Sequence, residues 1–284
     1  MSTGSDGETR PGYATRLVDY PFLSERSVDR WFLDEYAKLF PDRNPGAAED
    51  SPFARVDQKV VMGFTARVGS TLLCQHLFRY GVFVAEFFNP LHLDAGTHVR
   101  GATGYRDLCD RLVAAHALNG AWGVKAHVQC MPVLFLAGEF PEHIRAWRFV
   151  YLTRDNVVRQ AISRVIVDLR GAWSSWYEPT RELSNDDYSY DDIASTIYST
   201  KLDQASWERF FELYEIEPLR LSYETIVTDP ESAAAQVAVH CGLRLGGQDR
   251  VAPFDDPPLE PQETAFNAEW EERFRHEQLS RGST

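Results

Sequence analysis

The feature that most constrains the fold is a short apolar run that passes through a glycine-containing loop into a stretch of helical character. The run Lys59–Thr65 (KVVMGFT) is rich in β-branched residues and predicts a buried strand. The loop ARVGS follows it, and residues 71–80 then predict a helix that ends before Gly81. The end of a buried strand is therefore expected directly before the start of a helix.

Strands and helices are predicted to alternate along the remainder of the chain. Further strands are expected at residues 82–88, 123–126, 148–153 and 218–223, and further helices at residues 131–139, 156–169, 193–214 and 230–241. Such alternation implies an α/β fold, with a parallel sheet flanked by helices and ligands bound at the carboxyl ends of its strands. A chain of 284 residues fits one such domain with additions.

The two ends of the chain depart from this alternation. Residues 1–58 are expected to form a polar leader and an amphipathic helix at Ser27–Phe40, and residues 59–284 to form the α/β domain. The predicted apolar face of that helix, with Ser27 as its cap, consists of Val28, Trp31, Phe32, Tyr36, Leu39 and Phe40. Because this aromatic face cannot remain in water, the helix is expected to pack on the sheet domain. The acidic tail predicts a loop and a short helix at residues 269–278.

Charge and cysteine content argue against several classes of function. The formal net charge of -13 disfavours binding to nucleic acid or to anionic membranes, because both need a surplus of Lys and Arg. The sequence has no run of about eighteen apolar residues and no secretory signal, so a cytoplasmic protein without stable membrane insertion is expected. The 4 cysteines are scattered, and no metal-ligand spacing occurs, so no metal site is expected.

The loop between the first strand and its helix is the strongest local signal for binding. Backbone N–H groups at a helix N-terminus attract an anion, Gly69 lets the backbone come close to it, and Ser70 and Thr71 add hydroxyl donors. A nucleotide P-loop has four residues between its glycines and then a Lys, whereas here five residues separate Gly63 from Gly69 and Arg67 is the nearby cation. Because a kinase needs that Lys and a bound Mg²⁺, the loop is better suited to a metal-free phosphosulfate.

A second candidate anion site follows the strand predicted at residues 148–153. Arg154 stands just beyond that strand, and Ser163 lies nine residues further along the following helix. Such a pair can hold a separate phosphate through charge-assisted hydrogen bonds and a hydroxyl. A ligand such as 3′-phosphoadenosine 5′-phosphosulfate (PAPS), whose 3′-phosphate is well apart from its 5′-phosphosulfate, requires two such sites.

These segments resemble the PAPS-dependent sulfotransferases, and more narrowly the bacterial trehalose 2-sulfotransferase type. RVGSTLL is similar to that family's R-S-G-S-T-L-L, and GVFVAEFF to its G-V-x-G-x-P-x-E-F-F. VYLTRDNVVRQAIS is similar to its R-x-D-V-V-x-Q-A-V-S helix, and AWGVKAH to its W-G-G-K-L-M-W. The segment QETAFNAEWEERFRHE resembles a C-terminal Q-x-x-x-x-x-x-E-W-x-x-R-Y-R. The likeness runs, with gaps, from Lys59 to Glu277.

The resemblance implies a P-loop-like sulfotransferase fold that moves a sulfuryl group from PAPS to a hydroxyl of a small molecule, such as a carbohydrate, glycolipid or natural product. The product would be 3′-phosphoadenosine 5′-phosphate (PAP). By position, the 5′-phosphosulfate is expected at Arg67, Val68, Gly69, Ser70, Thr71 and Leu72, and the 3′-phosphate at Arg154 and Ser163. The resemblance implies Glu86 as the catalytic base of an in-line transfer, with Arg67 and Lys125 stabilising charge on the reacting groups.

Several alternatives stay open on the sequence. His92 and His127 are rival bases to Glu86, whose pKa is expected to be raised because aromatic residues follow it directly. A nucleotide or sugar kinase would use the same strand, loop and helix. A non-catalytic nucleotide-binding regulator would keep both anion sites and lack a base. The sequence does not identify the acceptor, and it leaves homodimer formation open.

Overall fold

The sheet at the centre of the molecule has five strands, and the computed structural model describes residues 19–40, 51–93, 101–245 and 259–281 around it. The strands are β1 (Gln58–Phe64), β2 (Val84–Ala85), β3 (Ala121–Ala126), β4 (Trp147–Thr153) and β5 (Leu219–Ser222). Their order is β2-β3-β1-β4-β5, and every neighbouring pair is parallel. The predicted α/β fold is confirmed, and the carboxyl ends of all strands meet at one edge.

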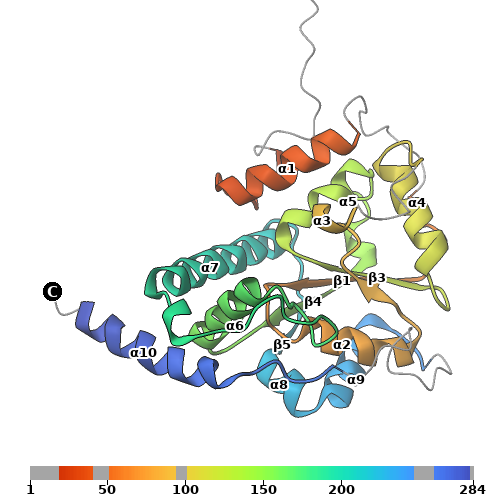
Figure 1. Cartoon of the computed structure of the whole chain (residues 1–284). Helices are drawn as coiled ribbons and strands as arrows, with labels where there is room; N and C mark the ends of the chain where they lie inside the picture. The colour runs from red at the N-terminus through yellow and green to blue at the C-terminus, as the bar shows by residue number, and fades with distance from the viewer. Residues whose placement is uncertain (1–18, 41–50, 94–100, 246–258, 282–284) are drawn as a thin grey trace, which may run out of the picture.

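Helices cover both faces of this sheet (Figure 1). They are α1 (Ser27–Leu39), α2 (Ser70–Leu77), α3 (Pro90–Leu93), α4 (Tyr105–His116), α5 (Pro132–Leu136), α6 (Val157–Arg170), α7 (Tyr190–Leu213), α8 (Tyr223–Thr228), α9 (Pro230–Cys241) and α10 (Ala265–Arg281). Val61 of β1 packs into a core with α1, α4, α5 and α7, whereas Val60 and Met62 pack into a second core with α2 and α9. Successive side chains of a strand point to opposite faces, which explains this division.

The central strand passes closely under α7 because of a glycine. A Cβ atom on Gly63 would lie 2.8 Å from the Trp207 ring of α7, closer than real contacts allow. Trp207 is fully buried, and its ring lies against Phe211 one turn further along α7. Gly63 is therefore needed for helix–sheet packing just before the binding loop begins.

Several predicted elements differ in length from the observed ones. The strand expected at residues 82–88 is only Val84–Ala85, because the chain turns sharply after it and the Phe87 N–H donates to the carbonyl of Ala85 at 3.0 Å. The helix expected at residues 131–139 is shortened to α5 and is preceded by the 3₁₀ helix η4 (Val128–Cys130). Helices α3, α4 and α8 were not predicted, and α10 is longer than expected at both ends.

The N-terminal helix α1 packs on the sheet domain as predicted, through a face that includes Phe32, Tyr36, Leu39 and Phe40 of the predicted set. Its buried residues are Asp29, Phe32, Leu33 and Tyr36. Val28 and Trp31, which were expected on the apolar face, are 41% and 37% exposed. The N-cap is Arg26 instead of Ser27, and its side chain makes no capping hydrogen bond. The division of the chain at residue 58 stays a prediction.

None of the described helices is both long and apolar enough to span a bilayer.

Candidate active site

The predicted binding loop ARVGS, residues 66–70, lies where the central strand β1 ends and α2 begins. Gly69 has φ 74° and precedes the first residue of α2, and Arg67 also has a positive φ of 68°. A Cβ atom on Gly69 would lie 3.3 Å from the Tyr223 ring. The two left-handed residues fold the backbone tightly at a helix N-terminus, which is the geometry that an anion-binding loop requires.

The side chains of the loop divide into two kinds. Val68 is fully buried in the core shared with α2 and α9, and Leu72 packs against that core. These two positions can meet a ligand through their backbone N–H groups. Ser70 is buried at the first position of α2, and Thr71 beside it is half-buried.

The two predicted anion sites meet in space. The Arg67 guanidinium donates to the Ser163 hydroxyl of α6 at 3.1 Å and to the Trp173 carbonyl at 2.9 Å. Arg154, just beyond β4, donates to the carbonyl of Arg67 at 3.3 Å. Its guanidinium lies over the Tyr223 ring, 3.9 Å from the centroid. Arg67, Arg154 and Ser163 are called the arginine cluster below.

The arginine cluster is positively charged and lacks an acidic partner among the described residues. None of the described carboxylates lies within ion-pair distance of the Arg67 or Arg154 guanidinium. Burial, followed by the charge of Arg154, lowers the pKa of Arg67 to about 10. Burial also lowers the pKa of Arg154, whose Nε is buried without a hydrogen-bond partner. Partly buried positive charge with an unused donor fits an anionic ligand.

A second cluster lies on the other side of the loop, at the ends of β2 and β3. The Lys125 ammonium is 3.0 Å from a Glu86 carboxylate oxygen and donates to the Thr71 hydroxyl, also at 3.0 Å. Lys125 lies over the Phe64 ring, 5.1 Å from the centroid, and the His127 ring contacts the same ring at a tilt, with centroids 4.3 Å apart. Glu86, Lys125 and His127 are called the acceptor-side cluster below.

The expectation of a raised pKa for Glu86 was wrong. Burial alone would raise that pKa, but the charge of Lys125 and then the charge of His127 lower it to about 2. Asn89 adds a hydrogen bond to the carboxylate at 3.2 Å. The neighbouring Phe88 does not determine the pKa, because Lys125 sits directly on the carboxylate. Glu86 is therefore ionised at neutral pH.

The structure describes the side chain of only one of the two rival bases, His127 and His92. Burial lowers the pKa of the His127 imidazole below its usual value, so this ring is neutral at pH 7. His92 belongs to α3, and its side chain lies outside the described part of the structure. His127 is thus the histidine that the described structure brings to Glu86.

Three further residues contact the binding loop and were not predicted from the sequence. Gln262 accepts a hydrogen bond from Arg67 at 3.0 Å, and Tyr223 lies under Arg154. Gln160 donates to the Ala66 carbonyl at 2.7 Å. Gln160 precedes Ser163 by about one helical turn, so the same helix face could have indicated it. The other two follow β5 or precede α10, and no local pattern marks them.

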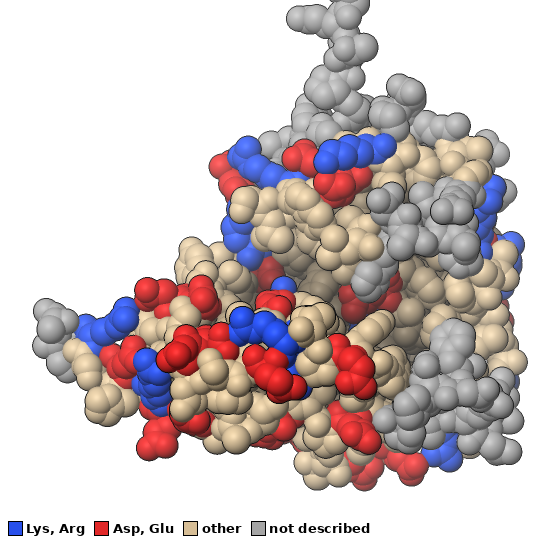
Figure 2. Space-filling model, in the orientation of Figure 1, with Lys and Arg blue, Asp and Glu red and all other residues tan. Residues whose placement is uncertain are grey.

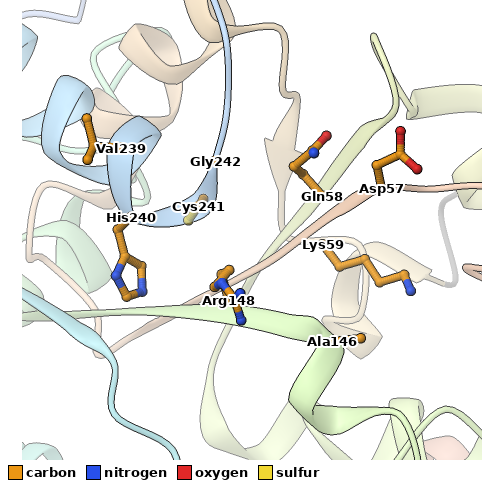
Figure 3. Close-up of a pocket in the computed structure, with 9 residues that line it drawn as sticks. All are labelled: Asp57, Gln58, Lys59, Ala146, Arg148, Val239, His240, Cys241 and Gly242. Carbon is orange, nitrogen blue, oxygen red and sulfur yellow. The ribbon is translucent and has the colours of Figure 1, made fainter.

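Two hollows among the described residues have to be distinguished. Figure 2 shows one face hollowed between the part that carries α1 and the part that carries α6 and α10. A cavity of about 290 Å³ lies elsewhere, at the amino ends of β1 and β4, and is lined by Asp57, Gln58, Lys59, Ala146, Arg148, Val239, His240, Cys241 and Gly242 (Figure 3). The binding loop follows the carboxyl end of β1, so this cavity is at the opposite edge of the sheet and is not the nucleotide site.

Comparisons with known proteins agree with the geometry. Residues 139–277 match the Stf0 sulphotransferase family, a stretch just under half of the chain that includes Arg154, Ser163 and Gln262. A search of curated proteins finds no match.

Solved structures with a similar course of the chain include two kinds of protein. Retinol dehydratase in complex with retinol and PAP is 13% identical, with a TM-score of 0.44 over 88% of this chain and 86% of that one. The sulfotransferase STF1 from Mycobacterium tuberculosis is also 13% identical, with a TM-score of 0.43 over 79% of this chain and 75% of that one. Retinol dehydratase with androsterone and PAP is 12% identical, with a TM-score of 0.42 over 87% and 85%.

The match over residues 139–277 and the two predicted anion sites on a parallel sheet point to the class of sulfotransferases. The family to which its residues 139–277 are matched is Stf0. The predicted enzyme class agrees with this family match. The binding loop itself lies before the matched stretch, so its assignment depends on its own geometry.

Proposed function

We propose that this enzyme transfers a sulfuryl group from PAPS to a hydroxyl of a small molecule, such as a carbohydrate, glycolipid or natural product. The observation that carries the proposal is the arginine cluster, where partly buried positive charge without a described acidic partner adjoins a left-handed loop at a helix N-terminus. A ligand with two separate anionic groups meets both requirements at once.

The proposed donor site has two halves. The backbone of residues 67–72 and the hydroxyls of Ser70 and Thr71 hold the 5′-phosphosulfate. Arg154 and Ser163 hold the 3′-phosphate. The Arg67 side chain is assigned with them, because its guanidinium already donates to Ser163 while its backbone forms part of the loop. This refines the sequence-based assignment of Arg67 to the 5′ group.

The proposed chemistry depends on positioning and charge stabilisation. PAPS supplies the sulfuryl group, and PAP is the leaving nucleotide. Lys125 donates to Thr71, the second residue of α2, so its ammonium is within reach of charge that develops at the loop. Holding the acceptor hydroxyl in line with the donor is expected to provide most of the rate.

The acceptor proton is proposed to leave through the acceptor-side cluster. Glu86 is the base that the sequence predicts, and its carboxylate is available at every ordinary pH. A pKa of about 2 makes it a weak proton acceptor. His127 is the second candidate, because its imidazole is neutral at pH 7 and adjoins Glu86. In both cases Lys125 stays beside Glu86.

Transfer of labelled sulfate from PAPS to a panel of hydroxyl compounds tests the proposal. Activity is expected to persist in EDTA, whereas a strict Mg²⁺ requirement with ATP as donor would identify a kinase. Tight PAP binding without turnover of any hydroxyl compound would identify a regulator.

The pH dependence of kcat separates the two bases. If His127 takes the proton, kcat falls on the acid side as the imidazole becomes protonated, at a pH below its usual pKa of 6.5. If Glu86 takes it, kcat stays level until well below pH 4.5. Flat acid-side behaviour that persists in a Glu86→Gln variant would contradict both assignments.

The other properties expected from the sequence are carried as proposals. The negative net charge supports an enzyme that binds no nucleic acid, and the expected location is the cytoplasm. Sedimentation analysis of the purified chain would decide the open question of a homodimer.

A further inference from the structure

Helix α1 makes two buried hydrogen bonds to the segments that carry the acceptor-side cluster. Phe88 lies two residues beyond Glu86, and its carbonyl accepts a hydrogen bond from the Tyr36 hydroxyl at 2.8 Å. Gln129 lies two residues beyond His127, and its side-chain amide donates to an Asp29 carboxylate oxygen at 2.9 Å. Tyr36 and Asp29 are both 0% exposed. One helix therefore holds the chain just after each of the two candidate bases.

The Asp29 end of this connection is itself firmly held. One Asp29 carboxylate oxygen accepts hydrogen bonds from the N–H and hydroxyl of Ser24, at 3.0 and 2.6 Å, and the other accepts from Arg26 at 3.0 Å. The Gln129 amide also donates to Asp203 of α7 at 2.7 Å. A buried carboxylate is costly unless it is paired and hydrogen-bonded, and here it is both. Gln129 is thus fixed between α1 and α7.

The two anchored segments have little regular structure of their own. Strand β2 ends at Ala85, directly before Glu86, and pairs with β3 at only two positions. His127 lies between the end of β3 and the single 3₁₀ turn of η4. The binding loop differs, since it is held between β1, which pairs on both sides, and α2. The acceptor-side cluster therefore depends on side-chain anchors more than the donor site does.

We propose that α1 is the positioning element of the acceptor-side cluster, with Tyr36 and Asp29 as its positioning residues. Through these two hydrogen bonds α1 sets where Glu86 and His127 stand relative to the acceptor hydroxyl, and it leaves the nucleotide site unchanged. The proposal rests on the proposed function of that cluster. It gives α1, which lies before the family-matched stretch, a role in catalysis in addition to its packing role.

A Tyr36→Phe variant tests the proposal, because it removes the hydroxyl and keeps the ring. Tyr105→Phe is the matched control, since the Tyr105 hydroxyl also makes a buried hydrogen bond to a backbone carbonyl, that of Tyr36, at 2.5 Å. A small misplacement of reacting groups costs up to about a hundredfold. We expect Tyr36→Phe to lower kcat about tenfold, Tyr105→Phe to change it less than about twofold, and PAP affinity to stay unchanged in both. Equal losses of kcat in the two variants, or a loss of PAP affinity in Tyr36→Phe, would overturn the proposal.

Hydrogen exchange in the PAP-bound protein supplies a readout that does not need turnover. Tyr36→Phe is expected to speed exchange in residues 84–89, and Asp29→Asn in residues 127–131, with residues 65–71 unchanged. Unaltered exchange in both acceptor-side segments would overturn the proposal. An inactive wild-type enzyme would instead remove the proposed function, and the exchange data would still decide whether α1 anchors these segments.

Discussion

The proposed donor side and the proposed acceptor side of the site differ in whether their charged side chains are paired. On the donor side, Arg67 and Arg154 lie together, partly buried, and none of the described carboxylates pairs with either. On the acceptor side, Lys125 is paired with Glu86 at 3.0 Å. Both sides stand at the carboxyl edge of the same sheet, so their strand positions do not account for the difference.

The difference indicates what each side receives. Burial, and then the charge of Arg154, lower the pKa of Arg67, and an anionic ligand would stabilise both positive charges. An ion pair is already neutral as a unit and has no such need. A neutral hydroxyl compound can enter beside it without a second charge. The comparison therefore supports the proposal that the anionic nucleotide binds on one side and an uncharged acceptor on the other.

The largest expected effect concerns the acceptor side. Glu86→Gln removes the carboxylate and keeps the size of the side chain, and loss of a general base costs on the order of 10²–10⁴ in rate. We expect kcat to fall within that range, while PAP affinity changes little because the arginine cluster is untouched. Steady-state kinetics with PAP titration measures both. Near-normal turnover would move the role to His127, and His127→Gln would then be expected to show the loss.

The next largest effect concerns the donor side. Arg154→Ala removes a charged donor, and hydrogen bonds to charged groups contribute about 1.5–3 kcal/mol each, so PAP affinity is expected to fall about 10- to 100-fold. Arg159→Ala is the matched control, because Arg159 lies on α6 nearby but is paired with Glu263 at 3.1 Å. Calorimetric titration with PAP would show the contrast. Equal losses in the two variants would mean that net charge, and not the arginine cluster, holds the nucleotide.

A smaller effect separates the two halves of the donor site. PAP is expected to raise the melting temperature, since a ligand at about a hundred times its Kd stabilises the native state by about 2.7 kcal/mol. Adenosine 5′-phosphate is expected to do much less, because it has no 3′-phosphate for Arg154 and Ser163. Thermal unfolding with each nucleotide at equal concentration is the measurement. The two-site assignment fails if both nucleotides stabilise equally.

The smallest effect is the pH dependence of stability on the acceptor side. The pKa of Glu86 is lowered from 4.5 to about 2 in the folded protein, so the stability from its ionisation is fully present above pH 4.5. It is lost as the pH falls from there towards 2. Urea unfolding at pH 6, 4 and 3 should show a difference between wild type and Glu86→Gln that shrinks with acidity. A constant difference across these pH values would show that Lys125 does not lower that pKa.

Local features of the site were predictable from the sequence. The first strand, its loop and the start of α2 follow from an apolar run, a glycine and two hydroxyl residues, all adjacent in the chain. Helix α9 runs over Pro230–Cys241 as predicted, because Asp229 caps its start and Gly242, with φ 66°, ends it. Interactions between near neighbours in the chain determine such elements, so their signals are visible in sequence order.

The relation between distant segments was decided only by the tertiary structure. The strand order brings Arg67 to Ser163 and Lys125 to Glu86, and neither pair is close in the chain. For the same reason the pKa of Glu86 was predicted in the wrong direction, since the aromatic neighbours in sequence are less important than a lysine from the next strand. Electrostatic and packing energies depend on distance in space, and the sequence alone does not contain that distance.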